Sequence, residues 1–305
     1  MKLRPDSSNG VEGLDLELDV RTSVSSVRHP VLKVRGTETS HREDQIAVEE
    51  PLEIRLGGMS LAVTMRTPGD DEELVAGLLF SEGAIASAHD LDVVARYPGP
   101  EGERDSGNVI NVLLRGDVTA ARKLLRRNFI AASSCGVCGK STIDAIGQSL
   151  PPVTSDLVAP ASLFGRIART MNEAQPIFDK TGGLHAAGLF DAEGRLVVLR
   201  EDIGRHNAVD KVVGHMVLAH RMPLDRYTLM VSGRASFEIM QKALKARIPV
   251  VAAVSAPSSM AVQMALASDM TLVGFLREGG FNVYAGAHRI VSDAAESPDH
   301  SPRRV

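Results

Sequence analysis

The chain holds only two cysteines, Cys135 and Cys138, and both lie in the short sequence SSCGVCGKS. A thiol pair with this spacing can supply half of a zinc site, cycle between dithiol and disulfide, or carry sulfur. A four-cysteine zinc site needs a second pair, which the chain lacks. A thioredoxin-type motif normally follows a strand, whereas this pair follows a basic helical stretch. A further alternative is that both cysteines are buried and inert. Gly136, Gly139 and two serines beside them fit that alternative poorly.

The chemistry that this stretch favours is nucleophilic attack by an accessible thiolate. Nearby cations lower the pKa of a thiol, and the sequence RKLLRR before the pair and Lys140 after it can supply them. The same cations also fit a solvated helix face. A thiolate that attacks an external persulfide becomes a persulfide, and the second thiol can then release or position the outer sulfur. A zinc site completed by His215 and His220 stays open, although histidines five residues apart do not share a helix face.

Three junctions between a strand and a helix form a second candidate site. VSGRAS contains Ser232 and Arg234, REDIGRHN contains Arg205 and His206, and VSAPSS follows a third strand. Helix N-termini at the carboxyl ends of parallel strands offer N–H groups to phosphates, and arginines add charge-assisted contacts. Ordinary turns use the same residue types. Because three such junctions occur together, we expect a phosphate-bearing ligand, although neither a dinucleotide fingerprint nor a P-loop is present.

Histidine and its neighbours give a third set of candidates. His185 in TGGLHAAGLF can act as a ligand or a base, or can be hydrogen-bonded within a sheet. Zinc deaminases use H-x-E, and Ala187 stands in place of that glutamate, which disfavours deaminase chemistry. In RHNAVDK we expect structural roles for Asp210 and Lys211.

Composition narrows the class of protein. The 305 residues are 44% hydrophobic, carry a net charge of −4 and have the length of about two domains. No basic field indicates nucleic-acid binding, and no apolar run reaches the roughly 18 residues of a membrane span. The N-terminus lacks the apolar core of a signal peptide, and two cysteines are too few for a disulfide scaffold. We therefore expect a cytoplasmic protein with reduced thiols.

The pattern of elements predicts an α/β protein with two domains between two tails. Residues 1–42 are expected to form a disordered tail with a strand at HPVLKVRG, and residues 293–305 a second tail. Residues 43–152 are expected to form a smaller α+β domain, with a hairpin around Gly57 and Gly58 and a helix that Asp70 or Asp71 caps. Residues 153–292 alternate strands and helices, which predicts a mainly parallel sheet covered by helices.

Six segments together resemble the FdhD family of formate dehydrogenase accessory sulfurtransferases. They are RTPGDDEELVAGLLFSEG, SSCGVCGK, TGGLHAAGLF, REDIGRHNAVDKVVG, VSGRASFEIMQKA and REGGFNVYAG, and they occur in family order over residues 46–290. The resemblance implies that a cysteine desulfurase donates sulfur as a persulfide. It also implies that the C-x-x-C segment passes this sulfur to the molybdenum cofactor, in its bis-molybdopterin guanine dinucleotide form. The cofactor would then enter the formate dehydrogenase apoprotein.

The resemblance also implies individual residues and an assembly. Cys135 matches the persulfide-carrying cysteine and Cys138 its partner, and no metal ligand is implied. The family segment that contacts the cofactor matches Phe281, Asn282, Val283, Tyr284, Ala285 and Gly286. The strand-to-helix junctions contribute four more residues to the expected cofactor-binding set: Arg205, His206, Ser232 and Arg234. The resemblance further implies a homodimer and a C-terminal domain similar in architecture to cytidine deaminases.

Two other classes of protein stay as alternatives. A chaperone that only holds the cofactor would keep its function after Cys135→Ala and lose it after changes at Arg205, Arg234 or Tyr284. A zinc-stabilised nucleotide-binding module would contain stoichiometric zinc that is lost when Cys138 is replaced.

Overall fold

The structure, a computed structural model, describes residues 24–97, 107–116, 118–129 and 151–293. The chain divides into two compact units that are interleaved along the sequence. The first unit combines the described residues before position 150 with Gln175–Ala186 and Arg200–Met222, and the rest belongs to the second unit. The units thus depart from the contiguous domains predicted over 43–152 and 153–292. The reason is that a helix from Arg200–Met222 packs on a helix near residue 75.

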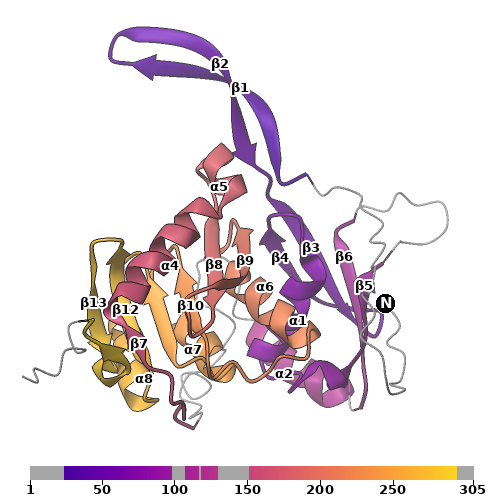
Figure 1. The fold of residues 1–305 in the computed structure, drawn as a ribbon. Coiled ribbons are helices and arrows are strands. Elements are labelled where there is room, and N and C mark those ends of the chain that lie inside the picture. The colour runs from indigo at the N-terminus through magenta and orange to yellow at the C-terminus, as the bar shows by residue number, and fades with distance from the viewer. Residues whose placement is uncertain (1–23, 98–106, 117, 130–150, 294–305) are drawn as a thin grey trace, which may run out of the picture. The chain divides into compact units, whose positions relative to one another are not determined.

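A four-stranded sheet organises the first unit (Figure 1). Its order is β4-β3-β6-β5, and the strands are β3 (Glu50–Leu56), β4 (Met59–Arg66), β5 (Leu91–Arg96) and β6 (Val109–Leu114). The turn Gly57-Gly58 joins β3 to β4, as the sequence predicts, and both glycines have a positive φ. On the inner face, Leu52, Ile54 and Ile110 are fully buried.

Two helices of the first unit pack against each other through a backbone contact. They are α1 (Asp71–Ser81) and α6 (Arg205–Leu218). A Cβ atom built on Gly77 would lie 1.8 Å from the carbonyl oxygen of Asp210, and one on Gly214 would lie 1.8 Å from that of Glu73. Only glycine at these two positions allows such a close approach. The unit also contains α2 (Val118–Phe129), α5 (Pro176–Thr181) and the short helix η1 (Ala88–Asp90).

The start of α1 differs from the prediction that Asp70 or Asp71 caps it. Asp70 occupies the N-cap position but makes no side-chain capping bond. Asp71 is fully buried and instead accepts two hydrogen bonds from Arg66, at 2.8 and 3.1 Å, and one from Arg96 at 3.2 Å. A carboxylate held by two arginines is thus used to join the helix to the sheet.

A two-stranded ribbon precedes the first sheet. It consists of β1 (Ser26–Arg35) and β2 (Glu38–Ala47), which pair in an antiparallel register from Ser26 opposite Ala47 to Arg35 opposite Glu38. Figure 1 shows the ribbon extending away from the sheet of its unit, with α5 near its base. The predicted tail over 1–42 is therefore wrong for residues 26–42, where only the strand at HPVLKVRG was expected. Nearly all ribbon residues are exposed, so hydrophobic periodicity gave little signal of it.

A six-stranded sheet organises the second unit, in the order β13-β12-β11-β10-β8-β9 (Figure 1). The strands are β8 (His185–Phe190), β9 (Leu196–Asp202), β10 (Thr228–Val231), β11 (Val250–Ala253), β12 (Thr271–Arg277) and β13 (Gly280–Ala285). Strands β10, β11 and β12 are parallel, whereas β8 and β13 run antiparallel to their neighbours β10 and β12. The sheet is therefore mixed rather than mainly parallel, because short hairpins connect its outer strands.

Three helices pack around this sheet: α4 (Ala161–Glu173), α7 (Phe237–Lys245) and α8 (Ser259–Ala267). A small pair of strands, β7 (Ala159–Pro160) and β14 (Ile290–Val291), and the short helix η2 (Ala287–Arg289) complete the second unit. The chain is thus mixed α/β, as the sequence predicts.

Candidate functional site at a sheet edge

The two cysteines lie outside the described residues. The described chain reaches Phe129 at the end of α2 and resumes at residue 151. Cys135 and Cys138 therefore stay predictions from sequence, and the structure describes the second predicted feature, the strand-to-helix junctions.

Two of these junctions lie side by side in the second unit because β10 and β11 are parallel neighbours. Ala235 forms a parallel bridge with Pro257, and the N–H of Ser258 donates to the carbonyl of Ala235 at 3.0 Å. Ser232 and Arg234 thus stand next to the turn that opens α8, where the Ser258 hydroxyl accepts a hydrogen bond from the N–H of Ala261 at 3.2 Å. Two of the three predicted junctions thus meet at the carboxyl ends of neighbouring parallel strands.

The predicted cofactor segment Phe281–Gly286 is the edge strand β13 and the residue that follows it. The ring of Phe281 packs on that of Phe164 in α4, with 4.8 Å between ring centroids. Gly286 has a positive φ, and its carbonyl accepts a hydrogen bond from the hydroxyl of Thr271 at 2.7 Å. The segment thereby belongs to the same sheet as β10, the strand that Ser232 and Arg234 follow.

A β-bulge distorts β12 opposite this edge strand. The pairing of Gly274 with Asn282 is followed by a register shift before Arg277 pairs with Gly280. Within the bulge, Phe275 has a φ of 53° and its side chain is 47% exposed. Bulky residues rarely adopt this left-handed conformation, which indicates local strain. A Cβ atom on Gly274 would lie 2.9 Å from the ring of Tyr284, so glycine lets Tyr284 approach the bulge.

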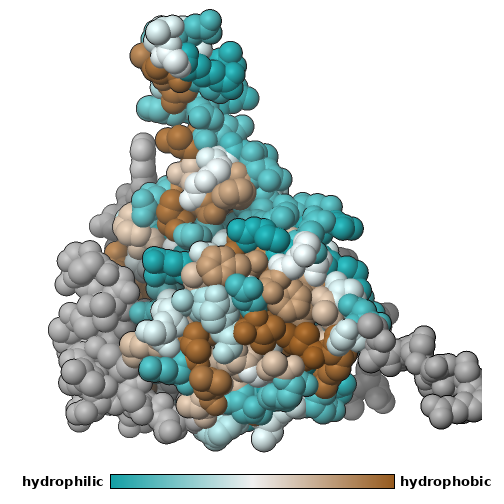
Figure 2. Space-filling view, turned by 90° about the vertical axis from the view of Figure 1, so that its left-hand side faces the viewer, coloured by the Kyte–Doolittle hydropathy of each residue, from teal (hydrophilic) through white to brown (hydrophobic). Residues whose placement is uncertain are grey.

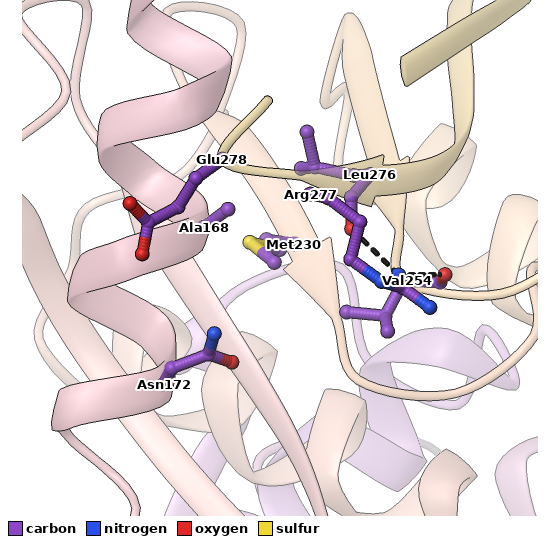
Figure 3. A pocket seen from close by; sticks show the side chains of 7 residues that line it. All are labelled: Ala168, Asn172, Met230, Val254, Leu276, Arg277 and Glu278. Carbon is purple, nitrogen blue, oxygen red and sulfur yellow. Dashed lines mark hydrogen bonds between the residues drawn. The ribbon is translucent and has the colours of Figure 1, made fainter. Parts of the chain in front are cut away.

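A cavity of about 400 Å³ opens beside the same strand ends (Figure 3). Its lining residues come from α4, β10, β12 and the segments after β11 and β12; they are Ala168, Asn172, Met230, Val254, Leu276, Arg277 and Glu278. Arg277 donates to the carbonyl oxygens of Val254 and Leu276, at 2.6 and 2.7 Å, which fixes its guanidinium at the rim. Glu278 pairs with Arg169 at 2.8 Å. The cavity combines apolar walls with an amide, a cation and an anion.

Arg205 and His206, the other predicted binding residues, belong to the first unit, where they open α6. The adjacent carboxylate of Asp202 is fully buried and accepts hydrogen bonds from the N–H groups of Thr67 and Gly204 at 3.2 and 2.8 Å. Lys211 pairs with Asp202 at 2.8 Å. The expected structural role of Lys211 is confirmed, and so is that of Asp210, which accepts a hydrogen bond from Ser81 at 2.9 Å.

His185 stands near this helix start and is half-buried. Burial lowers the pKa of His185, and the nearby charge of Arg205 lowers it further. The Nε atom of Arg205 is itself buried and has no hydrogen-bond partner among the described residues. Arg205 thus places a cation beside an imidazole whose pKa is lowered.

A polar cluster between α1 and α6 was not predicted from the sequence. Glu73 accepts hydrogen bonds from Nε of Arg200 at 2.6 Å and lies 2.9 Å from Nδ1 of His215. Burial raises the pKa of Glu73, but the bonds to His215 and Arg200 outweigh burial and the net shift is downward. Burial is the main factor that raises the pKa of neighbouring Asp70. No sequence motif marks this cluster, because its members are 15 to 142 positions apart.

Apolar side chains are exposed on the side of the second unit where β13 and α8 lie (Figure 2). The exposed ones are Met260 at 46%, Leu266 at 64%, Phe275 at 47% and Val283 at 39%. The helix α8 buries only Ala261 and Ala265, although most of its residues are apolar.

The described residues contain neither a cluster of metal-ligating side chains nor a membrane-spanning helix. In the part of the chain that the structure describes, no group of three or more histidine, cysteine, aspartate or glutamate side chains could hold a metal ion. Among the same residues, every helix is too short or too polar to cross a bilayer.

The fold defines a mixed α/β protein whose sheet edge gathers a neutral edge strand, two helix starts and a cavity. The FdhD/NarQ family model matches residues 47–291, and the chain belongs to this family. It is 49% identical over 276 residues to the sulfur carrier protein FdhD of Streptomyces avermitilis, a match that covers 88% of this chain and 96% of the relative. It is 48% identical over 275 residues to the Mycobacterium tuberculosis protein of the same name, with 88% and 98% covered.

A solved structure supports the same assignment. The crystal structure of a protein assigned as a formate dehydrogenase accessory protein, from Desulfotalea psychrophila, matches with a TM-score of 0.71 and 25% identity. The match covers 88% of this chain and all of that one. The family resemblance noted in the sequence is therefore confirmed.

Proposed function

We propose that this protein is a sulfur carrier that supports formate dehydrogenase, with Cys135 as the residue that accepts sulfur. One observation carries the proposal: the family match over residues 47–291 spans the C-x-x-C pair, and relatives named sulfur carrier protein FdhD are matched over 96% or more of their length. A cysteine desulfurase is the proposed donor. The molybdenum cofactor, as bis-molybdopterin guanine dinucleotide, is the proposed acceptor before it enters formate dehydrogenase.

The loading step requires a thiolate at Cys135. This thiolate attacks the terminal sulfur of a donor persulfide, a new S–S bond forms on Cys135, and the donor cysteine leaves as a thiolate. The sulfur changes carrier without net oxidation or reduction. The proton of the donor persulfide stays on the transferred sulfur or passes to water.

The delivery step gives Cys138 a role. Sulfane sulfur must gain two electrons to become sulfide, and attack of the Cys138 thiolate on the inner sulfur of Cys135 supplies them. Hydrosulfide then leaves toward the acceptor, and a disulfide between the two cysteines forms. A dithiol reductant returns this disulfide to the thiol pair. The proposal thus predicts that the two cysteines are not interchangeable.

The cofactor is cargo, and three features of the described residues fit its phosphates and rings. The junction with Ser232 and Arg234 lies beside the start of α8, a helix N-terminus that suits an anion. The cavity of about 400 Å³ falls within the usual range for small-molecule sites. The buried, unpaired Nε of Arg205 suits an anionic group as well. We further propose that Phe281–Gly286 contact the cofactor. We also propose that the second unit has a deaminase-like architecture.

The test is a persulfide assay on four proteins: the wild type, Cys135→Ala, Cys138→Ala and the double variant. Each is incubated with a cysteine desulfurase and cysteine, and the intact mass is measured. We expect a species heavier by one sulfur atom for the wild type and Cys138→Ala, and none for the two proteins without Cys135. Cys138→Ala should keep its persulfide longer after the donor is removed. Absence of the heavier species from the wild type refutes the proposal.

The exposed sheet edge also supports a second candidate, a chaperone that only binds the cofactor. In cells, that function would survive Cys135→Ala and be lost with Arg234→Ala, whereas a sulfur carrier loses formate dehydrogenase activity with Cys135→Ala. We further propose that the protein is a cytoplasmic homodimer. Light scattering after size-exclusion chromatography tests the dimer.

A further inference from the structure

The outer face of the four-stranded sheet in the first unit carries several exposed apolar side chains, and no described helix or strand covers them. Its inner face is the core described above, with Leu52, Ile54 and Ile110 fully buried. The side chains that alternate with these point outward, and none of the outward apolar ones is buried. We call this surface the open sheet face; its apolar members are Val63, Met65, Val93, Tyr97, Val109 and Leu113.

This face differs from an ordinary solvated sheet face. A sheet with one face in water usually alternates apolar inward residues with polar outward ones. Here Val63 is 63% exposed, Met65 is 47% exposed and Leu113 is 39% exposed. The apolar side chains of β4 lie on one side of β3 and those of β5 and β6 on the other, with Glu53 and Arg55 of β3 between them. Exposed apolar side chains gathered on one face of a soluble protein mark an interaction site.

The charges on this face are already paired with each other. Glu53 and Arg55 lie in the middle of β3 and form an ion pair at 2.8 Å. The guanidinium of Arg55 also stacks over the ring of Tyr97, 5.0 Å from its centroid. The face therefore offers apolar side chains and no free charge of either sign among these residues. Such a surface suits the apolar core of a protein interface and does not suit a ligand that carries several phosphates.

The chain itself ties this face to the cysteine segment. Helix α2 lies against β4, and Arg122 of α2 donates a hydrogen bond to the carbonyl of Leu56 at 2.7 Å, at the end of β3. Cys135 follows the end of α2 at Phe129 by six residues. With a helical rise of about 1.5 Å and at most about 3.5 Å per residue beyond it, Cys135 stays within roughly 30 Å of Arg122.

We propose that the open sheet face is where the protein that donates sulfur to Cys135 docks. The inference rests on the proposed function, in which a persulfide on a donor protein is attacked by the Cys135 thiolate. A transfer between two proteins needs a docking surface within reach of the thiol, and this face meets that need with a neutral, apolar sheet. Docking holds the donor persulfide near Cys135 and raises its effective concentration.

The experiment compares two sulfur donors on three full-length proteins. Val63→Lys places a charge on β4, the edge strand that carries the most exposed apolar side chain of the open sheet face. Leu266→Lys is the matched control, because Leu266 is 64% exposed and lies on α8 in the second unit. Each protein is loaded either by a cysteine desulfurase with cysteine or by glutathione persulfide, which needs no docking. Circular dichroism verifies that all three are folded, and the Met65→Lys variant replaces Val63→Lys if that variant is not.

We expect Val63→Lys to be loaded at least tenfold more slowly by the desulfurase and at the wild-type rate by glutathione persulfide. Leu266→Lys should match the wild type with both donors. Unchanged loading of Val63→Lys by the desulfurase overturns the proposal, and so does equal slowing with both donors, which would place the effect at the thiol. A change from dimer to monomer in Val63→Lys would assign the face to a contact between copies. If neither donor loads the wild type, both the sulfur-carrier function and the docking proposal that rests on it are refuted.

Discussion

Replacing Gly77 by alanine tests how closely α1 and α6 approach. The added Cβ would lie 1.8 Å from the carbonyl oxygen of Asp210, which is 1.6 Å short of an ordinary van der Waals contact of 3.4 Å. The opposing atom belongs to backbone, so no side-chain rotation can relieve the clash. The helices must separate, and dispersion contacts along both of them are lost.

The size of the effect follows from two opposing contributions. Overpacking a core typically costs 1–3 kcal/mol and occasionally more, and a rigid backbone clash lies at the upper end. Helix propensity favours alanine over glycine by about 1 kcal/mol. We therefore expect Gly77→Ala to lower the free energy of unfolding by about 2 kcal/mol.

A urea titration of the full-length protein, followed by far-ultraviolet circular dichroism, measures this loss. Gly279→Ala is the control, because a Cβ atom there would meet nothing within 4 Å, and its stability should change by less than about 0.5 kcal/mol. Gly214→Ala should behave like Gly77→Ala, and the double variant should lose less than the sum because the helices are already apart. A Gly77→Ala protein that gains about 1 kcal/mol, as propensity alone predicts, would refute the reasoning.

Three further experiments test other parts of the first unit. Lys211→Met leaves the Asp202 carboxylate buried without its cation and should lower the free energy of unfolding by about 3–5 kcal/mol. Adding Asp202→Asn to this variant should restore part of the lost stability. Additive losses of the two substitutions in urea titrations would contradict the pairing. Glu73 has a lowered pKa in the folded protein, so its charge stabilises the fold above its ordinary pKa of 4.5 and this contribution fades as pH falls below that value. Glu73→Gln should therefore be less stable than the wild type at pH 7, and the gap should narrow at pH 4; a gap independent of pH would argue against an ionised Glu73. His185 should protonate below the usual pKa of 6.5 in a nuclear magnetic resonance titration, and a midpoint above that value would show that burial and Arg205 do not control it.

Local sequence signals predicted most elements of the two units. Gly57 and Gly58 between two apolar runs indicated the β3–β4 hairpin, because a tight turn there needs positive φ. The parallel order of β10 and β11 followed from strand-helix alternation, and it places Ser232 and Arg234 beside the start of α8. These features depend on residues close together in the sequence.

Features that depend on distant residues were not predicted. Asp71 looks like a helix cap in the sequence, but Arg66 and Arg96 bind its carboxylate instead. The cavity needs Asn172 from α4 and Arg277 from β12, and no local pattern links the two. The ribbon over Ser26–Ala47 escaped the prediction because it is polar and exposed on both faces, so it lacks the alternation that marks a half-buried strand.

The partnership of α1 with α6 also has a consequence for synthesis on the ribosome. Ser81 ends α1, and its packing partner is complete only when Leu218 has been made. At about 5–20 residues per second, α1 waits roughly 7–27 s with its face around Gly77 uncovered by α6. The nascent first unit therefore exposes apolar surface for much of its translation, and a messenger that slows elongation between these helices would prolong the period in which it can aggregate.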